Sequence, residues 1–198
     1  MKKADGIEKY IGCRWTGVSI HSDSLPPGGR IKGKMSLCQA VAESFNKRTV
    51  LSIENIDCAG ARRSLGLTDN DEILARNISE KTGVSFPAAR KALRSVPRFD
   101  RPITGLTLGK QPKPDMILCF VPPEKAMALL RRWQEVHGEG PTLELSTFLS
   151  LCGGIIAATV QKGQICLSFG CPVSRKEGIL PSDTVIIGLP FGFLSIFT

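Results

Sequence analysis

The sequence predicts a single α+β domain, or an irregular α/β domain, that spans residues 1–198. A strand–helix–strand pattern between Asp115 and Phe169 is typical of a mixed β-sheet with helices packed on it. Helical patterns crowd together between Cys58 and Ser95, which argues against a regular doubly wound sheet. The composition, 42% hydrophobic and 22% charged, agrees with one globular domain that has a sizeable core.

The first half of the chain holds the earliest predicted strands and most of the predicted helices. Trp15, Val18 and Ile20 mark the first strand, and a β-branched run marks the second. Ser36 and Asp57 have side chains suited to capping helix N-termini. The predicted strands cover residues 10–21 and 49–53, and the predicted helices cover residues 37–47, 58–64, 69–83 and 85–95.

The clearest predicted strand, residues 115–121, lies in the second half of the chain. It is apolar almost throughout, which indicates a central strand with both faces covered. Residues 98–114 contain several helix and strand breakers, so we expect a loop or a short irregular hairpin there. The remaining predicted elements are helices over residues 123–138 and 151–161 and strands over residues 165–169 and 184–187.

Cysteine is the residue type that carries the most chemical information here. The seven cysteines are an odd number, so they cannot all pair within the chain, and no C-x-x-C pair occurs. Four of them stand near predicted helix starts, glycine pairs or strand ends, where unpaired N–H groups and the helix dipole stabilise a thiolate. These four are Cys38, Cys58, Cys152 and Cys171.

Three interpretations of these four cysteines stay open: core packing, a shared metal or iron–sulfur site, and pairwise thiol–disulfide chemistry. Soft thiolates select Zn²⁺ or iron–sulfur clusters, and Gly153, Gly154 and Gly170 would let the backbone approach a cluster closely, which favours iron–sulfur over zinc. Cys13, Cys119 and Cys166 lie on predicted strands, and we interpret them as core residues.

Only two histidines are present, and neither has a nucleophile signature beside it. His137 ends a predicted helix, where a cation is favoured, whereas His21 borders a Pro-Gly loop and could act as a further ligand or a base. No Walker loop, G-x-G-x-x-G or H-E-x-x-H motif occurs, so the sequence does not establish an enzyme activity.

An alternative function is the binding of a small anionic ligand without a metal. The loop Gly28–Lys34 carries Arg30, Lys32 and Lys34 and precedes a capped helix, the order in which anion-binding loops occur. Arg175 lies four residues after Cys171 and could hold the same anion, or it could pair with Glu177 on the surface. A scaffold that acts through protein partners is a further alternative.

The positive charge of the chain suggests nucleic-acid binding, but no sequence motif supports that function. The net charge is +8, and much of it falls between Arg90 and Lys113. That stretch has one aromatic residue and no nucleic-acid-binding motif, so we expect a solvated basic segment.

No apolar run reaches the ~20 residues of a membrane span, and residues 1–6 lack a signal-peptide core, so we expect a cytoplasmic location without membrane contact.

A succession of short motifs resembles the uncharacterised ArCR family of archaea and bacteria, domain-of-unknown-function family 169. The resemblance runs from about Trp15 to Pro190 and implies cysteines at the four positions named above, with no established activity. It also implies a helix after the last strand, whereas this chain ends in an apolar tail, residues 191–198, that we interpret as atypical, shortened or frameshifted. The motifs are Ser36-Leu37-Cys38-Gln39-Ala40-Val41, Cys58-Ala59-Gly60-Ala61, Leu65-Gly66-Leu67, Pro114-Asp115, Pro123–Met127, and Ser168-Phe169-Gly170-Cys171 with Arg175.

The leading hypothesis from the sequence is therefore a cytoplasmic protein that binds zinc or an iron–sulfur cluster through four cysteines. A redox or cofactor-handling role would follow from such a group. Its substrate, reaction and oligomeric state are beyond what these residues indicate.

Overall fold

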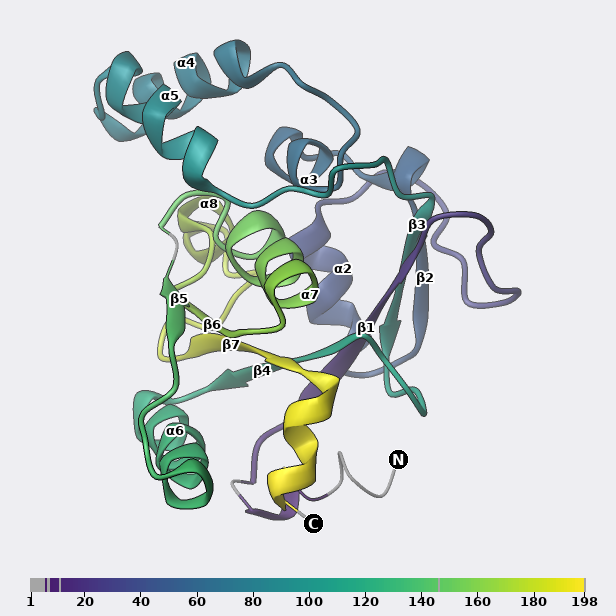
Figure 1. Ribbon diagram of the computed structural model, residues 1–198. Helices are drawn as coiled ribbons and strands as arrows, with labels where there is room; N and C mark the ends of the chain where they lie inside the picture. The colour runs from purple at the N-terminus through teal and green to yellow at the C-terminus, as the bar shows by residue number, and fades with distance from the viewer. Residues whose placement is uncertain (1–5, 7, 11, 146, 198) are drawn as a thin grey trace.

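One mixed β-sheet organises the protein. The computed structural model describes residues 6, 8–10, 12–145 and 147–197 (Figure 1). Within these residues, seven strands form a sheet in the order β2-β3-β1-β4-β7-β6-β5, in which only β5 and β6 pair in parallel. The strands are β1 (Trp15–His21), β2 (Thr49–Ser52), β3 (Gly105–Gly109), β4 (Met116–Val121), β5 (Leu143–Leu145), β6 (Ile165–Ser168) and β7 (Val185–Pro190).

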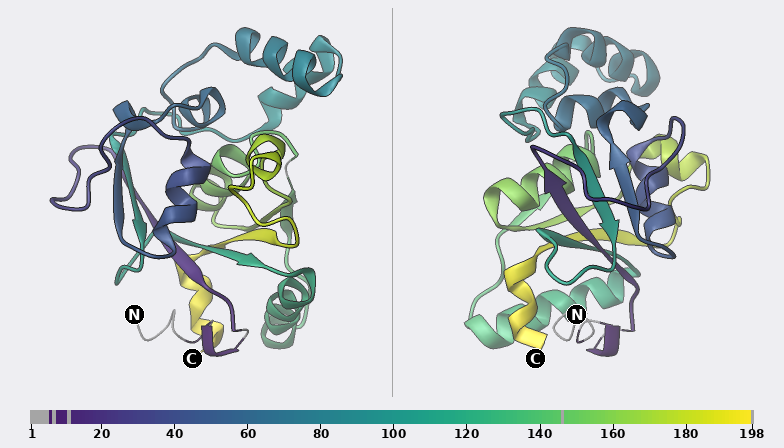
Figure 2. Two further views of the ribbon diagram at one scale, coloured as in Figure 1. Left: turned by 180° about the vertical axis from the view of Figure 1, so that it is seen from behind. Right: turned by 90° about the vertical axis from the view of Figure 1, so that its right-hand side faces the viewer.

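Helices cover both faces of this sheet (Figures 1 and 2). Helices α2, α3, α7 and α8 lie over one face, α6 and the C-terminal helix η3 lie over the other, and α4 and α5 form a lobe beyond α3. The helical elements are α2 (Leu37–Ser44), η1 (Ile53–Asn55), α3 (Ala59–Ser64), α4 (Asp71–Thr82), α5 (Phe86–Ser95), α6 (Pro123–His137), the π-helix η2 (Cys152–Ala157), α7 (Ala158–Lys162), α8 (Pro172–Lys176) and η3 (Phe191–Phe197). The α+β prediction is confirmed.

Strand β4 shows why the sheet needs cover on both sides. Side chains of a strand alternate between the two faces, and here both faces are apolar. Met116 and Leu118 join the core under α2, α3 and α7, whereas Ile117 and Cys119 join the core under α6 and η3. All four are fully buried, so the prediction of a central strand over residues 115–121 is confirmed.

The largest error of the sequence interpretation concerns residues 98–114. They contain β3, a fully buried strand between β1 and β2, and are not merely a loop or an irregular hairpin. A Cβ added at Gly105 would stand 2.3 Å from the carbonyl oxygen of Leu51, so only glycine permits this close pairing with β2. The glycines that suggested a break are thus part of a strand. Strand β5 and helix α8 were also not predicted.

Some helix starts differ from those predicted. Cys58, not Asp57, occupies the N-cap of α3, and Asn70, not Asp69, caps α4 by accepting a hydrogen bond from the Ile73 N–H. The Ser36 cap is confirmed: its hydroxyl accepts from the Gln39 N–H at 3.2 Å, and the Gln39 side chain accepts from the Ser36 N–H at 2.8 Å.

The C-terminal residues that the sequence marked as atypical are packed against the sheet. Residues 191–197 form the 3₁₀ helix η3, and Phe193, Leu194 and Ile196 are buried in the core beneath α6. The Trp133 ring of α6 stacks on Phe193, with 5.1 Å between the ring centroids.

A buried arginine ties the α4–α5 lobe to the rest of the domain. Arg63 of α3 is 3% exposed, and its Nε donates to Asp71 Oδ1 at 2.8 Å. Its Nη atoms donate to the carbonyl oxygens of Val96 and Leu93 at 2.9 and 2.6 Å. One guanidinium therefore bridges α3, the start of α4 and the end of α5.

We predict that Arg63→Met lowers the free energy of unfolding by about 3 kcal/mol, because it leaves a carboxylate and two carbonyls without their charged donor. Arg98→Met is the matched control. It removes a pair with Asp69 whose side chains are 42% and 90% exposed, so it should cost less than about 1 kcal/mol. Denaturant unfolding measures both, and equal losses would contradict the anchoring role of Arg63.

Candidate functional site

The four cysteines singled out by the sequence each begin a helical segment on the same face of the sheet. Cys38 is the second residue of α2, Cys58 is the N-cap of α3, Cys152 is the first residue of η2, and Cys171 is the N-cap of α8. All four belong to or pack against one apolar cluster. Cys38 and Cys152 are buried, whereas Cys58 and Cys171 are partly exposed.

Cys171 has the environment of a stabilised thiolate. Pro172 opens α8, and the backbone N–H groups of Val173 and Ser174, together with the Ser174 hydroxyl, face the Cys171 sulfur. Hydrogen bonding from the Cys38 thiol and the contacts at the start of α8 together lower the pKa of Cys171 from 9.0 to about 5, against the opposing effect of burial. The same interaction, followed by burial, raises the pKa of Cys38.

Cys152 follows a strained part of the backbone at Leu149. Leu149 has φ of +47°, and among the described residues it is the only residue other than glycine with positive φ. Such a conformation costs about 1–3 kcal/mol. The Leu149 carbonyl accepts from the N–H groups of Gly153 and Gly154, at 2.9 and 3.1 Å, and from the Cys152 thiol at 3.5 Å. The strain and the π-helix together fix the direction of Cys152, and both features are frequent at functional sites.

Helix α3 packs directly against Cys152. A Cβ added at Gly60 would stand 3.9 Å from the Cys152 sulfur and 2.6 Å from Leu149 Cδ2, so glycine as the second residue of α3 allows this approach. Burial raises the pKa of Cys152 to about 12, and the charges of Cys58 and Cys171 act in the same direction. These interactions link Cys152 with Cys58 and Cys171, while Cys38 interacts with Cys171 and Cys152.

The glycines near the cysteines have packing roles. A Cβ at Gly153 would meet Val96 Cγ1 at 2.4 Å and the Pro97 carbonyl oxygen at 3.0 Å. Gly170 has φ of +86° and lies against the Leu180 and Arg175 side chains. Packing therefore accounts for the glycine at both positions.

The arrangement is not that of a preformed site for a single metal ion. Across residues 6, 8–10, 12–145 and 147–197, no three His, Cys, Asp or Glu side chains are grouped so that they could hold one ion. All seven cysteines are free thiols.

Comparison with known families agrees with the resemblance seen in the sequence. The model of the family described as uncharacterised ArCR, domain-of-unknown-function family 169, matches residues 17–195. The chain belongs to this family. The match includes all four of these cysteines and the first part of the packed helix η3, up to residue 195. No curated protein and no solved structure matches the chain.

The other three cysteines of this ArCR chain are core residues, as predicted. Cys119 and Cys166 have no exposed surface, and Cys13 is 5% exposed. Cys13 and Cys119 pack in the core beneath α6, on the opposite face from Cys171.

The cations predicted to bind an anion lie in different settings. Arg30 and Lys32 are exposed, and the segment at Arg30 pairs with Val50 at the β2 edge. Lys34 is exposed and lines a pocket of about 320 Å³ together with Ile179. Arg175 donates instead to the backbone carbonyls of Phe169, Pro181 and Thr184. Those bonds close the segment that carries Cys171, which gives Arg175 a structural role.

Both histidines have local partners. His21 Nε2 lies 2.8 Å from Thr107 Oγ1 on the neighbouring strand β3. His137 stacks on Trp133 at 3.8 Å, and its Nδ1 lies 3.0 Å from the Trp133 carbonyl oxygen at the end of α6. Each ring is held by its neighbours within the fold.

The basic stretch is partly neutralised by acidic residues in and just before α4. Arg90 pairs with Glu72 at 2.7 Å, and Arg98 pairs with Asp69.

The described helices include none that is both long enough and apolar enough to cross a membrane.

The sequence interpretation missed Leu149 and Ser174. Positive φ at a leucine leaves no signal in the sequence. The Cys171-Pro172 pair did carry one, because proline is common at the first position of a helix and marks Cys171 as an N-cap.

We predict that the alkylation rate of Cys171 by iodoacetamide in metal-free protein rises to a plateau with an inflection near pH 5. The lowered pKa of Cys171 makes it a thiolate above that pH. Cys38→Ala removes the hydrogen bond, so the inflection should move to higher pH, toward 9.0. Mass spectrometry of the Cys171 peptide across the pH range measures this.

Cys166→Ala is the control for the alkylation profile, because Cys166 is buried and has no part in the ionisation of Cys171. An inflection that is the same in wild type and Cys38→Ala would contradict the pairing of the two thiols.

Proposed function

We propose that this protein binds an iron–sulfur cluster through Cys38, Cys58, Cys152 and Cys171. The observation that carries the proposal is the gathering of four helical N-termini, each with a cysteine, on one face of the sheet. Each N-terminus carries the positive end of a helix dipole. Four such ends favour an anionic group, and a thiolate-ligated cluster is one.

Burial gives a second argument for a bound group. Desolvation raises the pKa of Cys152 to about 12, and negative charge on its neighbours opposes its ionisation further. Several thiolates at one buried site need a compensating positive charge. Iron or zinc supplies that charge, and binding releases the thiol protons.

The ligand set favours a cluster over zinc, and so does the absence of a ready group for one ion in the part of the chain that the structure describes. Zinc in a structural site draws four ligands to about 2.0–2.3 Å from one centre. The described residues contain no group of side chains arranged to hold one ion. A cluster takes thiolates that are farther apart, one at each of its corners. All-cysteine ligation is also the common set for iron–sulfur clusters.

A second candidate is thiol–disulfide exchange by Cys171 and Cys38, which their hydrogen bond favours. The Cys171 thiolate would attack one sulfur of a disulfide substrate and release a thiolate. Cys38 would then lose its proton and attack the mixed disulfide, which releases the second substrate thiolate and leaves a Cys38–Cys171 disulfide. Cys58 and Cys152 have no part in this reaction.

Anaerobic purification with analysis of iron, zinc and acid-labile sulfide tests the proposal. We expect iron and sulfide in the wild-type protein and their loss in Cys58→Ser and in Cys171→Ser. Serine keeps the volume of cysteine but is a poor soft-metal ligand. Cys166→Ala is the control: it removes a buried thiol from the same cluster of core residues and should keep iron and sulfide.

The outcomes separate the candidates. Zinc without sulfide would replace the cluster by a structural ion. A metal-free protein in which Cys38 and Cys171 form a disulfide, with exchange activity that survives Cys58→Ser, would favour the second candidate. Equal iron content in wild type and both serine variants would refute the ligand assignment.

A further inference from the structure

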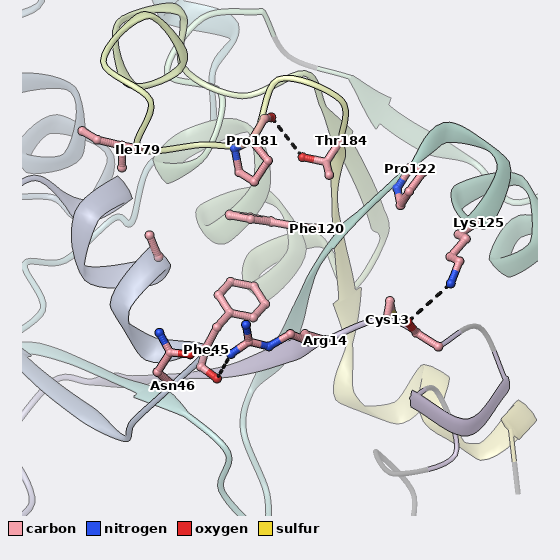
Figure 3. A pocket seen from close by; sticks show the side chains of 12 residues that line it. Cys13, Arg14, Phe45, Asn46, Phe120, Pro122, Lys125, Ile179, Pro181 and Thr184 are labelled. Carbon is pink, nitrogen blue, oxygen red and sulfur yellow. Dashed lines mark hydrogen bonds between the residues drawn. The ribbon is translucent and has the colours of Figure 1, made fainter.

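A pocket of about 520 Å³ lies apart from the four cysteines, none of which lines it (Figure 3). Its walls come from segments far apart in the sequence: the chain before β1, the end of α2, the end of β4, the start of α6 and the segment between α8 and β7. Its volume falls within the usual range for small-molecule sites, roughly 300–1,000 Å³. The lining residues are Gly12, Cys13, Arg14, Ala42, Phe45, Asn46, Phe120, Pro122, Lys125, Ile179, Pro181 and Thr184.

The charge of this pocket is positive. Arg14 and Lys125 line it, and no aspartate or glutamate is among its lining residues. One nitrogen of Arg14, Nη2, donates to the Phe45 carbonyl at 2.8 Å and to Asn46 Oδ1 at 2.5 Å. Within the described residues no other nitrogen of this exposed guanidinium has a hydrogen-bond partner, so Nε and Nη1 stay available to a ligand.

Lys125 is held loosely on the other side of the pocket. Its ammonium donates one long hydrogen bond, 3.4 Å, to the Gly12 carbonyl, which leaves further donor capacity (Figure 3). Lys125 also acts on Cys13, another residue that lines the pocket. Hydrogen bonding from Cys119 lowers the pKa of Cys13, and the positive charge of Lys125 lowers it further.

Aromatic surface lies beside Arg14, whose guanidinium carbon stands 5.9 Å from the centre of the Phe45 ring. The rings of Phe45 and Phe120 stand 4.9 Å apart at 45°, and Figure 3 shows Phe120 between Phe45 and the Pro181–Thr184 segment. Pro122, Ile179 and Pro181 extend the apolar wall. Such a surface binds a flat apolar body, and the neighbouring guanidinium of Arg14 binds an acidic group attached to it.

We propose that this pocket binds a small aromatic anion, with its acidic group held by Arg14 and its ring against Phe45 and Phe120, while Lys125 adds positive charge from the other side of the pocket. The site differs from the anion site expected between the Gly28–Lys34 loop and Arg175, because Arg175 is occupied by backbone carbonyls. Arg175 instead holds the carbonyls of Pro181 and Thr184, and thereby the pocket wall, next to the segment that carries Cys171.

The test uses the fluorescence of 8-anilinonaphthalene-1-sulfonate, an aromatic anion, titrated with the full-length protein. We expect saturable binding to the wild type and about tenfold weaker binding to Arg14→Gln, the loss typical of one charge-assisted hydrogen bond. Lys125→Gln should weaken binding by less, because it removes positive charge from the other side of the pocket. Lys91→Gln is the matched control, since it removes the same charge from an exposed site outside the pocket and should leave binding unchanged.

The uncharged analogue N-phenyl-1-naphthylamine tests the need for the anion. It should bind more weakly than the sulfonate to the wild type and equally to all four proteins. Displacement of the sulfonate by benzoate or by phenyl phosphate supports the proposal and identifies the preferred acidic group. Displacement by neither compound, or equal sulfonate affinity in wild type, Arg14→Gln and Lys125→Gln, overturns it.

Discussion

The chemistry of this protein depends on one packing constraint: α2, α3, η2 and α8 must all cover the same face of one sheet. Each of these segments starts with or next to a cysteine. Because their N-termini gather over that face, the thiols interact although up to 133 residues separate them in the chain, from position 38 to position 171. The site is thus a product of topology, with no ligand motif in any single segment.

Backbone strain, which costs free energy, and two arginine side chains help to fix the positions of these segments. Leu149 adopts a strained backbone conformation to start η2. Arg63 and Arg175 donate to backbone carbonyls, Arg63 from α3 to the end of α5 and Arg175 around the segment of Cys171. Arg63 also pairs with Asp71 at the start of α4. A fold that only needed a core could dispense with strain at Leu149. Its position beside Cys152 is consistent with a site whose geometry matters more than local stability.

Much of this could be predicted from the sequence, and the failures have physical causes. β4 and α6 were recognisable because their apolar patterns are long and regular, and the four cysteines because helix-start signals lie close to them. β3 was missed because glycines usually break strands, whereas Gly105 permits close contact with Leu51. The partners of Arg175 were not predicted because they are backbone carbonyls, which a sequence does not display. The pocket between Arg14 and Lys125 joins segments that no local pattern connects.

The central claim is that the four thiols share one bound group. A crystal structure of anaerobically purified protein, with anomalous diffraction collected at the iron edge, tests it most directly. The account predicts iron density bonded to the sulfurs of Cys38, Cys58, Cys152 and Cys171, at the convergence of α2, α3, η2 and α8. Four reduced thiols with no anomalous density between them, in protein shown by elemental analysis to carry iron elsewhere or none, would contradict it.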